Sequence, residues 1–221
     1  MSHNTWIHQI ARVLVRPLVA SPVTPNHVTT LRLVMGVAAA GAAAEGSEGW
    51  RQVGAGLFLV SMLLDRADGE LARLSGRKSA FGHKYDLVSD SIANALIFIG
   101  LGIGLRDNVP GAVPMGTVAG FAVAAILWLV MRVENIAGRR AAELGGRAGF
   151  DPDDGMLVVP VLMGVGGGTP LLYAAAVGAA LFAVFFFWRF HRYLGTVAPP
   201  DSPSAGSGEG LGHGHSLIDD S

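Results

Sequence analysis

Long apolar segments constrain the fold of this chain more than any other feature. A helix needs roughly 20 mainly apolar residues to cross the hydrocarbon core of a bilayer, and such segments recur along most of the sequence. Only 15% of the 221 residues are charged, whereas soluble domains carry roughly a quarter. The chain is therefore predicted to be an all-α membrane protein.

Six segments are predicted to be transmembrane helices. They are Val28 to Ala44, Val53 to about Arg73, Gly82 to Leu105, Ala112 to Met131, a short Gly-rich segment near Met156, and Pro170 to Trp188. Many are rich in Ala and Gly, which let helix backbones approach closely in lipid. These patterns predict a tight six-helix bundle over about residues 28–190.

The two ends of the chain differ from this bundle. Apolar residues between Trp6 and Leu14 recur at steps of three and four, which favours an amphipathic helix in the membrane interface within residues 1–23. Residues 195–221 are rich in Gly, Ser and Pro and are expected to form a disordered polar tail. Residues 1–194 would then form a single membrane-embedded domain.

Basic residues indicate the orientation. With the N-terminus in the cytoplasm, only Arg51 and Arg106 of the 16 Lys and Arg residues lie on the far side. Because Lys and Arg accumulate on the cytoplasmic side of membrane proteins, we expect both termini in the cytoplasm. The net charge of −1 gives no reason to expect a nucleic acid partner.

Four aspartates gather at the predicted cytoplasmic ends of the second and third segments. Asp65, Asp68, Gly69, Ala72 and Arg73 follow helical spacing along one stripe, and Gly82, Asp86 and Asp90 follow another. The turn at residues 74–81 lets the two stripes face each other across an antiparallel helix pair. We therefore expect Asp65, Asp68, Asp86 and Asp90, the motif aspartates, to converge.

Convergent carboxylates in a partly dry site repel each other and have raised pKa values unless cations balance them. All-oxygen ligation favours Mg²⁺, Mn²⁺ or Ca²⁺ over zinc or copper. Two such ions about 4 Å apart would stabilise the attacking and leaving oxygens of phosphoryl transfer. Gly69 and Gly82 leave room for a ligand beside the carboxylates, and Arg73 offers a planar fork to a phosphate oxygen.

Three other interpretations remain open. The aspartates could pair with Arg66, Arg73 and Lys84 in a structural ion network. They could line a divalent-cation transporter or channel, although the fourth to sixth segments carry no ionisable residue in their apolar spans. A purely structural membrane protein would leave the motif unexplained.

The spacing Asp65-x2-Asp68-Gly69-x2-Ala72-Arg73-x8-Gly82-x3-Asp86-x3-Asp90 resembles the complete motif of the CDP-alcohol phosphotransferase superfamily. The resemblance extends to the segment Thr24-Pro25-Asn26 before the first span. It implies an enzyme of phospholipid synthesis that transfers a substituted phosphate from a CDP-linked lipid donor, such as CDP-diacylglycerol (CDP-DAG), to a small alcohol and releases CMP.

The resemblance also implies residue roles. Asp65, Asp68 and Asp86 would hold two Mg²⁺ or Mn²⁺ ions, and Asp90 would contact a metal and accept the proton of the attacking hydroxyl. The residues that frame the CDP group would be Asp68, Gly69, Ala72, Arg73 and Gly82. A homodimer is compatible with this assignment.

The acceptor alcohol is less defined. Asp90-Ser91 departs from the Asp-Lys ending of members that resemble phosphatidylglycerophosphate synthases, and from the Arg that follows the last Asp in inositol-phosphate transferases. Arg132, Arg139 and Arg140, predicted to lie on the same side as the motif, could bind a phosphate on the acceptor. They could equally be ordinary cytoplasmic anchors.

Overall fold

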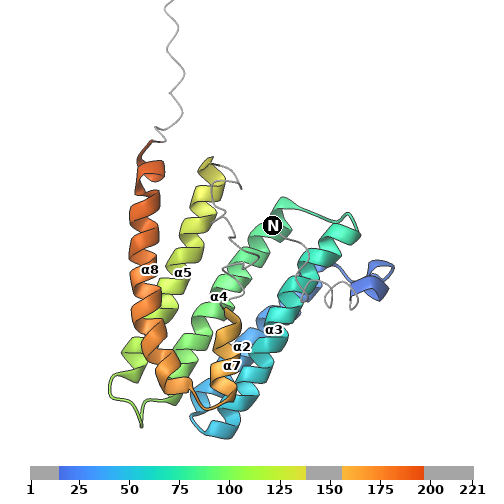
Figure 1. Cartoon of the computed structure of the whole chain (residues 1–221). Coiled ribbons are helices and arrows are strands. Elements are labelled where there is room, and N and C mark those ends of the chain that lie inside the picture. The colour runs from blue at the N-terminus through green and yellow to red at the C-terminus, as the bar shows by residue number, and fades with distance from the viewer. Residues whose placement is uncertain (1–14, 138–155, 197–221) are drawn as a thin grey trace, which may run out of the picture.

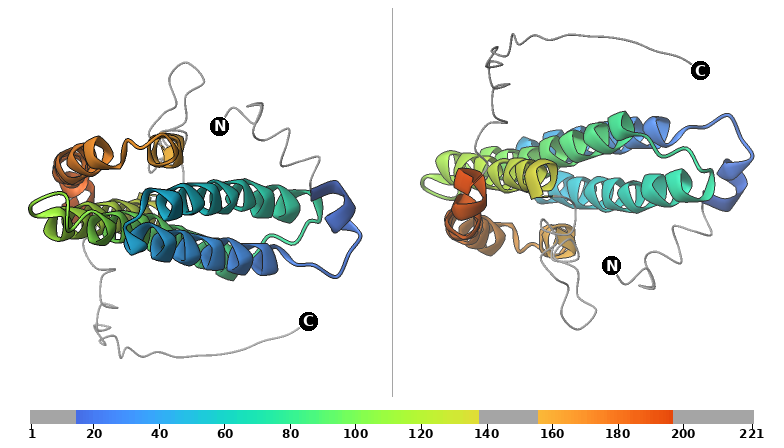
Figure 2. Two further views of the ribbon diagram at one scale, coloured as in Figure 1. Left: turned by 90° about the horizontal axis from the view of Figure 1, so that it is seen from below. Right: turned by 90° about the horizontal axis from the view of Figure 1, so that it is seen from above.

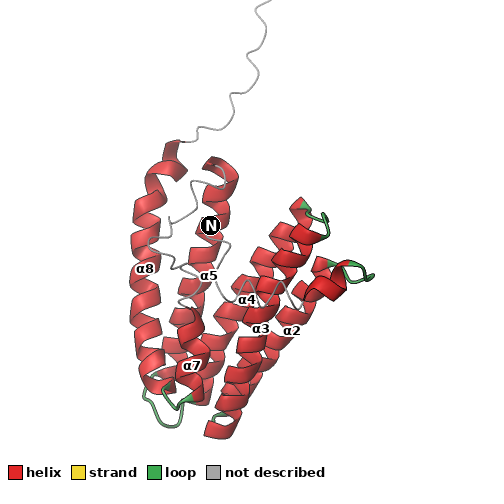
Figure 3. Cartoon of the chain, turned by 45° about the vertical axis from the view of Figure 1, so that its right-hand side comes forward, coloured by secondary structure: helices red, strands yellow, loops and turns green. Residues whose placement is uncertain are grey.

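The computed structural model describes residues 15–137 and 156–196, which are helical apart from short connections and contain no strand (Figure 3). The helices are α2 (Pro25–Glu45), α3 (Glu48–Leu74), α4 (Ala80–Gly104), α5 (Ala112–Ala137), α7 (Val158–Gly164) and α8 (Gly168–Thr196). Residues 15–19 form a further short helical stretch. The predicted all-α class is confirmed for the part of the chain that is described.

Four helices are long and apolar enough to cross a membrane, namely α2, α4, α5 and α8. Helix α3 is long enough, at 27 residues, but its C-terminal part is charged. The seven residues of α7 span only about 10 Å, too little to cross a bilayer alone. Six transmembrane helices therefore remain a prediction, since residues 138–155 before α7 lie outside the described part.

Local sequence sets where the helices near the site begin. Thr24 caps α2 by accepting a hydrogen bond from the His27 amide at 3.4 Å, and Pro25 takes the first turn, where its missing N–H costs nothing. Ser79 caps α4 by accepting from the Gly82 amide at 2.9 Å. Gly76 adopts a φ of 68° in the connection between α3 and α4, a backbone conformation that suits glycine.

Helix α2 packs along both α3 and α4, whereas α3 and α4 contact each other at few positions. Helix α5 packs on α4, α8 packs on α5, and α7 lies against α3 (Figures 1 and 2). The prediction that α3 and α4 pair directly is thus replaced by an arrangement in which α2 joins them. This arrangement places residues of α2 between the two aspartate stripes.

Small residues make the α2–α4 contact close. A Cβ added at Gly100 or Gly104 of α4 would overlap the carbonyl of Ala40 or Ala43 on α2. The predicted close packing through Ala and Gly is confirmed at this contact. Large apolar side chains on the outer helices instead point outwards, with Phe121 and Val184 67% and 69% exposed, as expected of surfaces that face lipid.

The ends of the described chain bear on two other predictions. Val15 is fully buried against Val28, Ala67 and Leu71, so the segment before α2 packs on α2 and α3. The interfacial helix was predicted from residues between Trp6 and Leu14, which lie outside the described residues. The predicted tail lies outside them too, from residue 197 onwards, and α8 extends to Thr196.

Candidate active site

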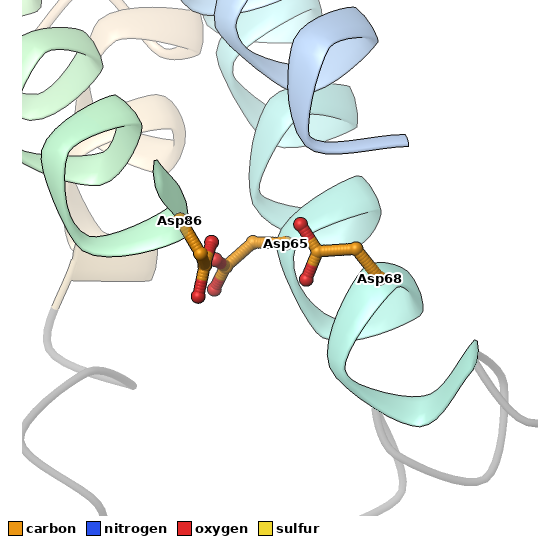
Figure 4. Close-up of side chains that lie close together, drawn as sticks. All are labelled: Asp65, Asp68 and Asp86. Atoms are coloured by element: carbon orange, nitrogen blue, oxygen red, sulfur yellow. The ribbon is translucent and has the colours of Figure 1, made fainter. Parts of the chain in front are cut away.

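Three of the motif aspartates come together at one end of the helices. Asp65 and Asp68 lie in the last three turns of α3, and Asp86 lies in the second turn of α4. One carboxylate oxygen from each lies within 4.8 Å of the others, a spacing that can hold a metal ion (Figure 4). Asp68 is 4% exposed. The predicted convergence is confirmed for these three.

The fourth aspartate, Asp90, joins the others through an arginine that the sequence analysis did not single out. Arg32 of α2 is 2% exposed. Its Nη1 lies 2.9 Å from Asp65 and 2.8 Å from Asp86, and its Nη2 donates to Asp90. Arg32 is the only charged residue between Val28 and Ala44, and a charge within an apolar span is the signal that could have identified it.

Other polar side chains orient the carboxylates. The Thr29 hydroxyl donates to Asp68 Oδ2 at 2.7 Å, and the Asn94 amide donates to Asp90 Oδ1 at 2.7 Å. Ser61 of α3 donates to the Arg32 carbonyl at 3.0 Å, which ties α2 to α3 beside the cluster. Each motif aspartate thus has a defined partner from a neighbouring turn or helix.

The charges of this cluster do not balance. Four ionised carboxylates and one guanidinium leave a formal charge of −3, and Asp68 is almost fully buried. Such an excess in a partly dry site is relieved either by protonation of a carboxylate or by bound cations. Carboxylate oxygens are ligands that Mg²⁺ and Mn²⁺ accept, so the donor set fits the predicted divalent metals.

A pocket of about 190 Å³ opens beside the aspartates. It is formed by the start of α2, the end of α3, the connection to α4 and the first turns of α4. Its lining residues are Pro25, Asn26, Thr29, Asp68, Gly69, Ala72, Arg77, Lys78, Ser79, Gly82, His83 and Asp86. Five residues of the predicted metal and CDP sites, Asp68, Gly69, Ala72, Gly82 and Asp86, therefore line one cavity.

The two motif glycines differ in their surroundings. A Cβ added at Gly69 would meet nothing within 4 Å, so the bare backbone there serves no helix contact within the described chain. A Cβ at Gly82 would lie 3.0 Å from both Asn26 Oδ1 and Ser79 Oγ. Gly82 thus permits the close approach of α2 and the α4 cap, while Gly69 leaves pocket space open.

The basic residues are placed differently from the prediction. Arg73 donates from Nε and Nη2 to the buried Glu70, at 3.0 and 2.6 Å, and is not among the pocket-lining residues. Arg77 and Lys78 line the pocket instead. Arg77 and Lys78 lie in the turn after α3, which borders the pocket, so they are candidates for binding a phosphate group there.

The predicted acceptor residues are only partly described. Arg132 is exposed near the end of α5, its guanidinium 5.3 Å from the centre of the Trp128 ring. Helix α5 ends at the same end of the molecule at which α4 begins (Figure 1). Arg139 and Arg140 lie outside the described residues.

Comparison with known proteins agrees with this geometry. The sequence model of the family described as CDP-alcohol phosphatidyltransferase matches residues 22–189. A bifunctional IPC transferase and DIPP synthase from Rubrobacter xylanophilus is 30% identical over 165 residues, which cover 74% of this chain and 36% of that protein. The chain therefore spans about a third of the length of this curated relative.

Solved structures of Mycobacterium tuberculosis phosphatidylinositol phosphate synthase share the fold. The structure with CDP-DAG bound has a TM-score of 0.59 and 26% identity, over 92% of this chain and all of that one. The complex with manganese and citrate has the same TM-score at 24% identity, over 82% and 88% of the two chains.

The family match covers the aspartates, the pocket, the apolar helices α2, α4 and α5, and most of α8. The motif resemblance noted from the sequence agrees with it, and nothing in these comparisons supports a transporter. The chain is an integral membrane protein that belongs to the CDP-alcohol phosphatidyltransferase family.

Proposed function

We propose that the chain transfers a phosphatidyl group from CDP-DAG to a small alcohol and releases CMP. The observation that carries the proposal is the cluster of Asp65, Asp68 and Asp86 beside a pocket lined by Gly69 and Gly82. A structure with a similar fold, at 26% identity, was solved with CDP-DAG bound.

Asp65, Asp68 and Asp86 would hold the Mg²⁺ or Mn²⁺ ions. When bound, these ions would neutralise charge on the diphosphate and polarise its phosphoryl oxygens. The chain's own part is to hold the three carboxylates at fixed positions: Thr29 orients Asp68 at 2.7 Å, and Arg32 orients Asp65 and Asp86 at 2.9 and 2.8 Å.

Asp90 is the proposed general base. It accepts hydrogen bonds from Arg32 and Asn94 and stands outside the group of three with metal-binding spacing. A hydroxyl is a poor nucleophile at neutral pH, so a carboxylate that accepts its proton speeds the attack. The alcohol oxygen then bonds to the lipid phosphorus, the bond from that phosphorus to CMP breaks, and the proton goes to Asp90.

The pocket is the proposed site of the CDP group. Gly69 and Ala72 give it a flat wall on α3, and Gly82 forms the facing wall on α4. Arg77 and Lys78 place positive charge at the pocket, where a diphosphate would lie. We assign the phosphate contact to these residues in place of Arg73, which is engaged with Glu70.

The acceptor is proposed to carry its own phosphate. Arg132, Arg139 and Arg140 are the best cationic candidates, because α5 ends at the end of the molecule at which α4 begins (Figure 1), and Asp86 lies near the start of α4. A phosphatidylinositol phosphate synthase shares the fold, which also favours this class. Neutral alcohols are the alternative, and they would need no arginine cluster.

The remaining proposals concern the membrane. Arg51 and Arg106 both donate to backbone carbonyls near the α2–α3 turn, those of Gly46 and Ala44, at the end of the molecule opposite the aspartates. This supports an active site on the cytoplasmic face with the N-terminus on the same side. We further propose six membrane spans, one catalytic domain over residues 1–194, and a homodimer.

An acceptor screen tests the proposed function. Purified protein in detergent receives CDP-DAG, Mg²⁺ and one alcohol at a time, including inositol phosphate, glycerol phosphate and their unphosphorylated forms, and CMP release is measured. Release only with a phosphorylated alcohol supports the proposal. CMP release only with neutral alcohols contradicts the proposal that the acceptor carries a phosphate. No release with any alcohol contradicts the proposal that CDP-DAG is the donor.

A further inference from the structure

One face of α2 contacts all four motif aspartates. Thr29 binds Asp68, and Arg32, one turn later on the same face, binds the other three. The family motif that identifies the site lies on α3 and α4 alone. Helix α2 therefore contributes to the site through residues outside that motif.

Arg32 makes these contacts from a buried position. Its guanidinium uses Nη1 for Asp65 and Asp86 and Nη2 for Asp90, so it joins carboxylates from both α3 and α4. It is 2% exposed, and the buried charge is tolerated because carboxylates surround it. Since α3 and α4 contact each other at few positions, Arg32 is a main link between the two halves of the site.

The guanidinium has a second effect, which acts on metal binding. A fixed positive charge next to carboxylates attracts them but repels any further cation that binds there. In a site of low dielectric this repulsion is larger than at a surface. The same residue should therefore stabilise the metal-free protein and weaken its affinity for a divalent ion.

We propose that Arg32 is a positioning residue that acts as the resident counter-cation of the aspartate cluster. It holds Asp65, Asp86 and Asp90 together before a divalent cation arrives, and it keeps the affinity for that cation moderate. The inference rests on the metal site of the proposed function. It assigns Arg32 no contact with substrate.

Thermal unfolding of the full chain in detergent tests the inference, first in EDTA and then with increasing Mn²⁺. Arg32→Gln should lower Tm in EDTA, because three carboxylates lose their cation. It should also lower the Mn²⁺ concentration that gives half of the maximal rise in Tm, by about tenfold. Loss of a merely structural contact would not tighten metal binding.

Two further variants complete the design. Arg32→Lys keeps the charge but replaces the planar fork by one ammonium, so its Mn²⁺ midpoint should stay near the wild-type value while its Tm in EDTA falls partway. Arg106→Gln is the control. Arg106 is 49% exposed, pairs with Asp107 and donates to the Ala44 and Ile103 carbonyls, all away from the aspartates, so its Mn²⁺ midpoint should not change even if its Tm in EDTA falls slightly.

The outcomes separate this inference from the proposed function. If Mn²⁺ does not raise the Tm of the wild-type protein, the metal site fails and the inference fails with it. If the wild-type protein responds but Arg32→Gln needs as much Mn²⁺ or more, only the role of Arg32 is overturned. If Arg32→Gln does not fold, Arg32→Lys decides, because a midpoint far from the wild-type value would overturn the role of the charge.

Discussion

Gly69 offers a test in which stability and binding should change in opposite directions. Gly69 lies in the C-terminal part of α3 and lines the pocket, and a Cβ added there would meet no atom within 4 Å. Replacing an exposed helical glycine by alanine stabilises a helix by about 1 kcal/mol. In a protein of this size that raises Tm by about 2–4 °C.

Binding should respond in the other direction. If the CDP group lies against the bare backbone, the methyl group of Gly69→Ala weakens binding of CDP-DAG, and the larger side chain of Gly69→Leu prevents it. Gly100→Ala is the matched control, because its Cβ would overlap the Ala40 carbonyl. It should lower stability by about 1–3 kcal/mol and leave binding by the folded fraction unchanged.

Thermal unfolding with and without CDP-DAG measures both quantities for each variant. We expect Gly69→Leu to unfold near the wild-type temperature and to lose the rise in Tm that the donor causes. Unchanged donor binding by Gly69→Leu would refute the placement of CDP against α3. A large fall in Tm without donor would mean that Gly69 serves helix packing instead.

Three further predictions concern the metal, the aspartates and the acceptor. Excess EDTA should abolish CMP release, Mg²⁺ or Mn²⁺ should restore it and Zn²⁺ should do so poorly, because the donors are all oxygen; full release in EDTA would contradict this. Asp90→Asn should abolish turnover but keep donor binding, whereas Asp68→Asn should weaken metal and donor binding together. If both variants lose donor binding equally, Asp90 is a metal ligand and its role as base is unsupported. Replacing Arg139 and Arg140 by Gln should raise KM for a phosphorylated acceptor with little change for CDP-DAG, and unchanged kinetics would favour a neutral acceptor.

The apolar helices were predictable because each contains a long segment of mainly apolar residues. The predicted span Val28 to Ala44 became Pro25–Glu45, and Gly82 to Leu105 became Ala80–Gly104. Helices extend beyond their apolar residues because capping groups such as Thr24 and Ser79, rather than hydropathy, set their first turns.

The helix-to-helix arrangement was not predictable in the same way. Spacing placed the aspartates on two stripes, but it could not show that α2 packs along both α3 and α4. From the sequence, Arg32 counted only as one of the basic residues assigned to a side of the membrane. Its three carboxylate partners lie 33 to 58 positions away in the chain. Such pairings depend on tertiary packing, which local periodicity does not encode.

Arg73 illustrates a second limit. Its spacing from Asp65 favoured a position on the same stripe, facing the ligand. Glu70, three residues earlier, is buried and accepts two hydrogen bonds from Arg73, and this local pair holds the guanidinium outside the pocket lining. A long side chain on a helix can reach neighbours three or four residues away as well as groups in front of the helix. Spacing alone could therefore not decide whether Arg73 pairs with Glu70 or faces the ligand.

The aspartate cluster on α3 and α4 is proposed to carry out transfer from a CDP-linked lipid. The most direct measurement is CMP release from CDP-DAG by purified wild-type protein and by Asp86→Asn, each titrated with Mg²⁺ in the presence of the acceptor that the screen identifies. We expect Mg²⁺-dependent release by the wild-type protein and none by Asp86→Asn, although both fold. Equal release by the two proteins, or release that does not depend on Mg²⁺, would contradict it.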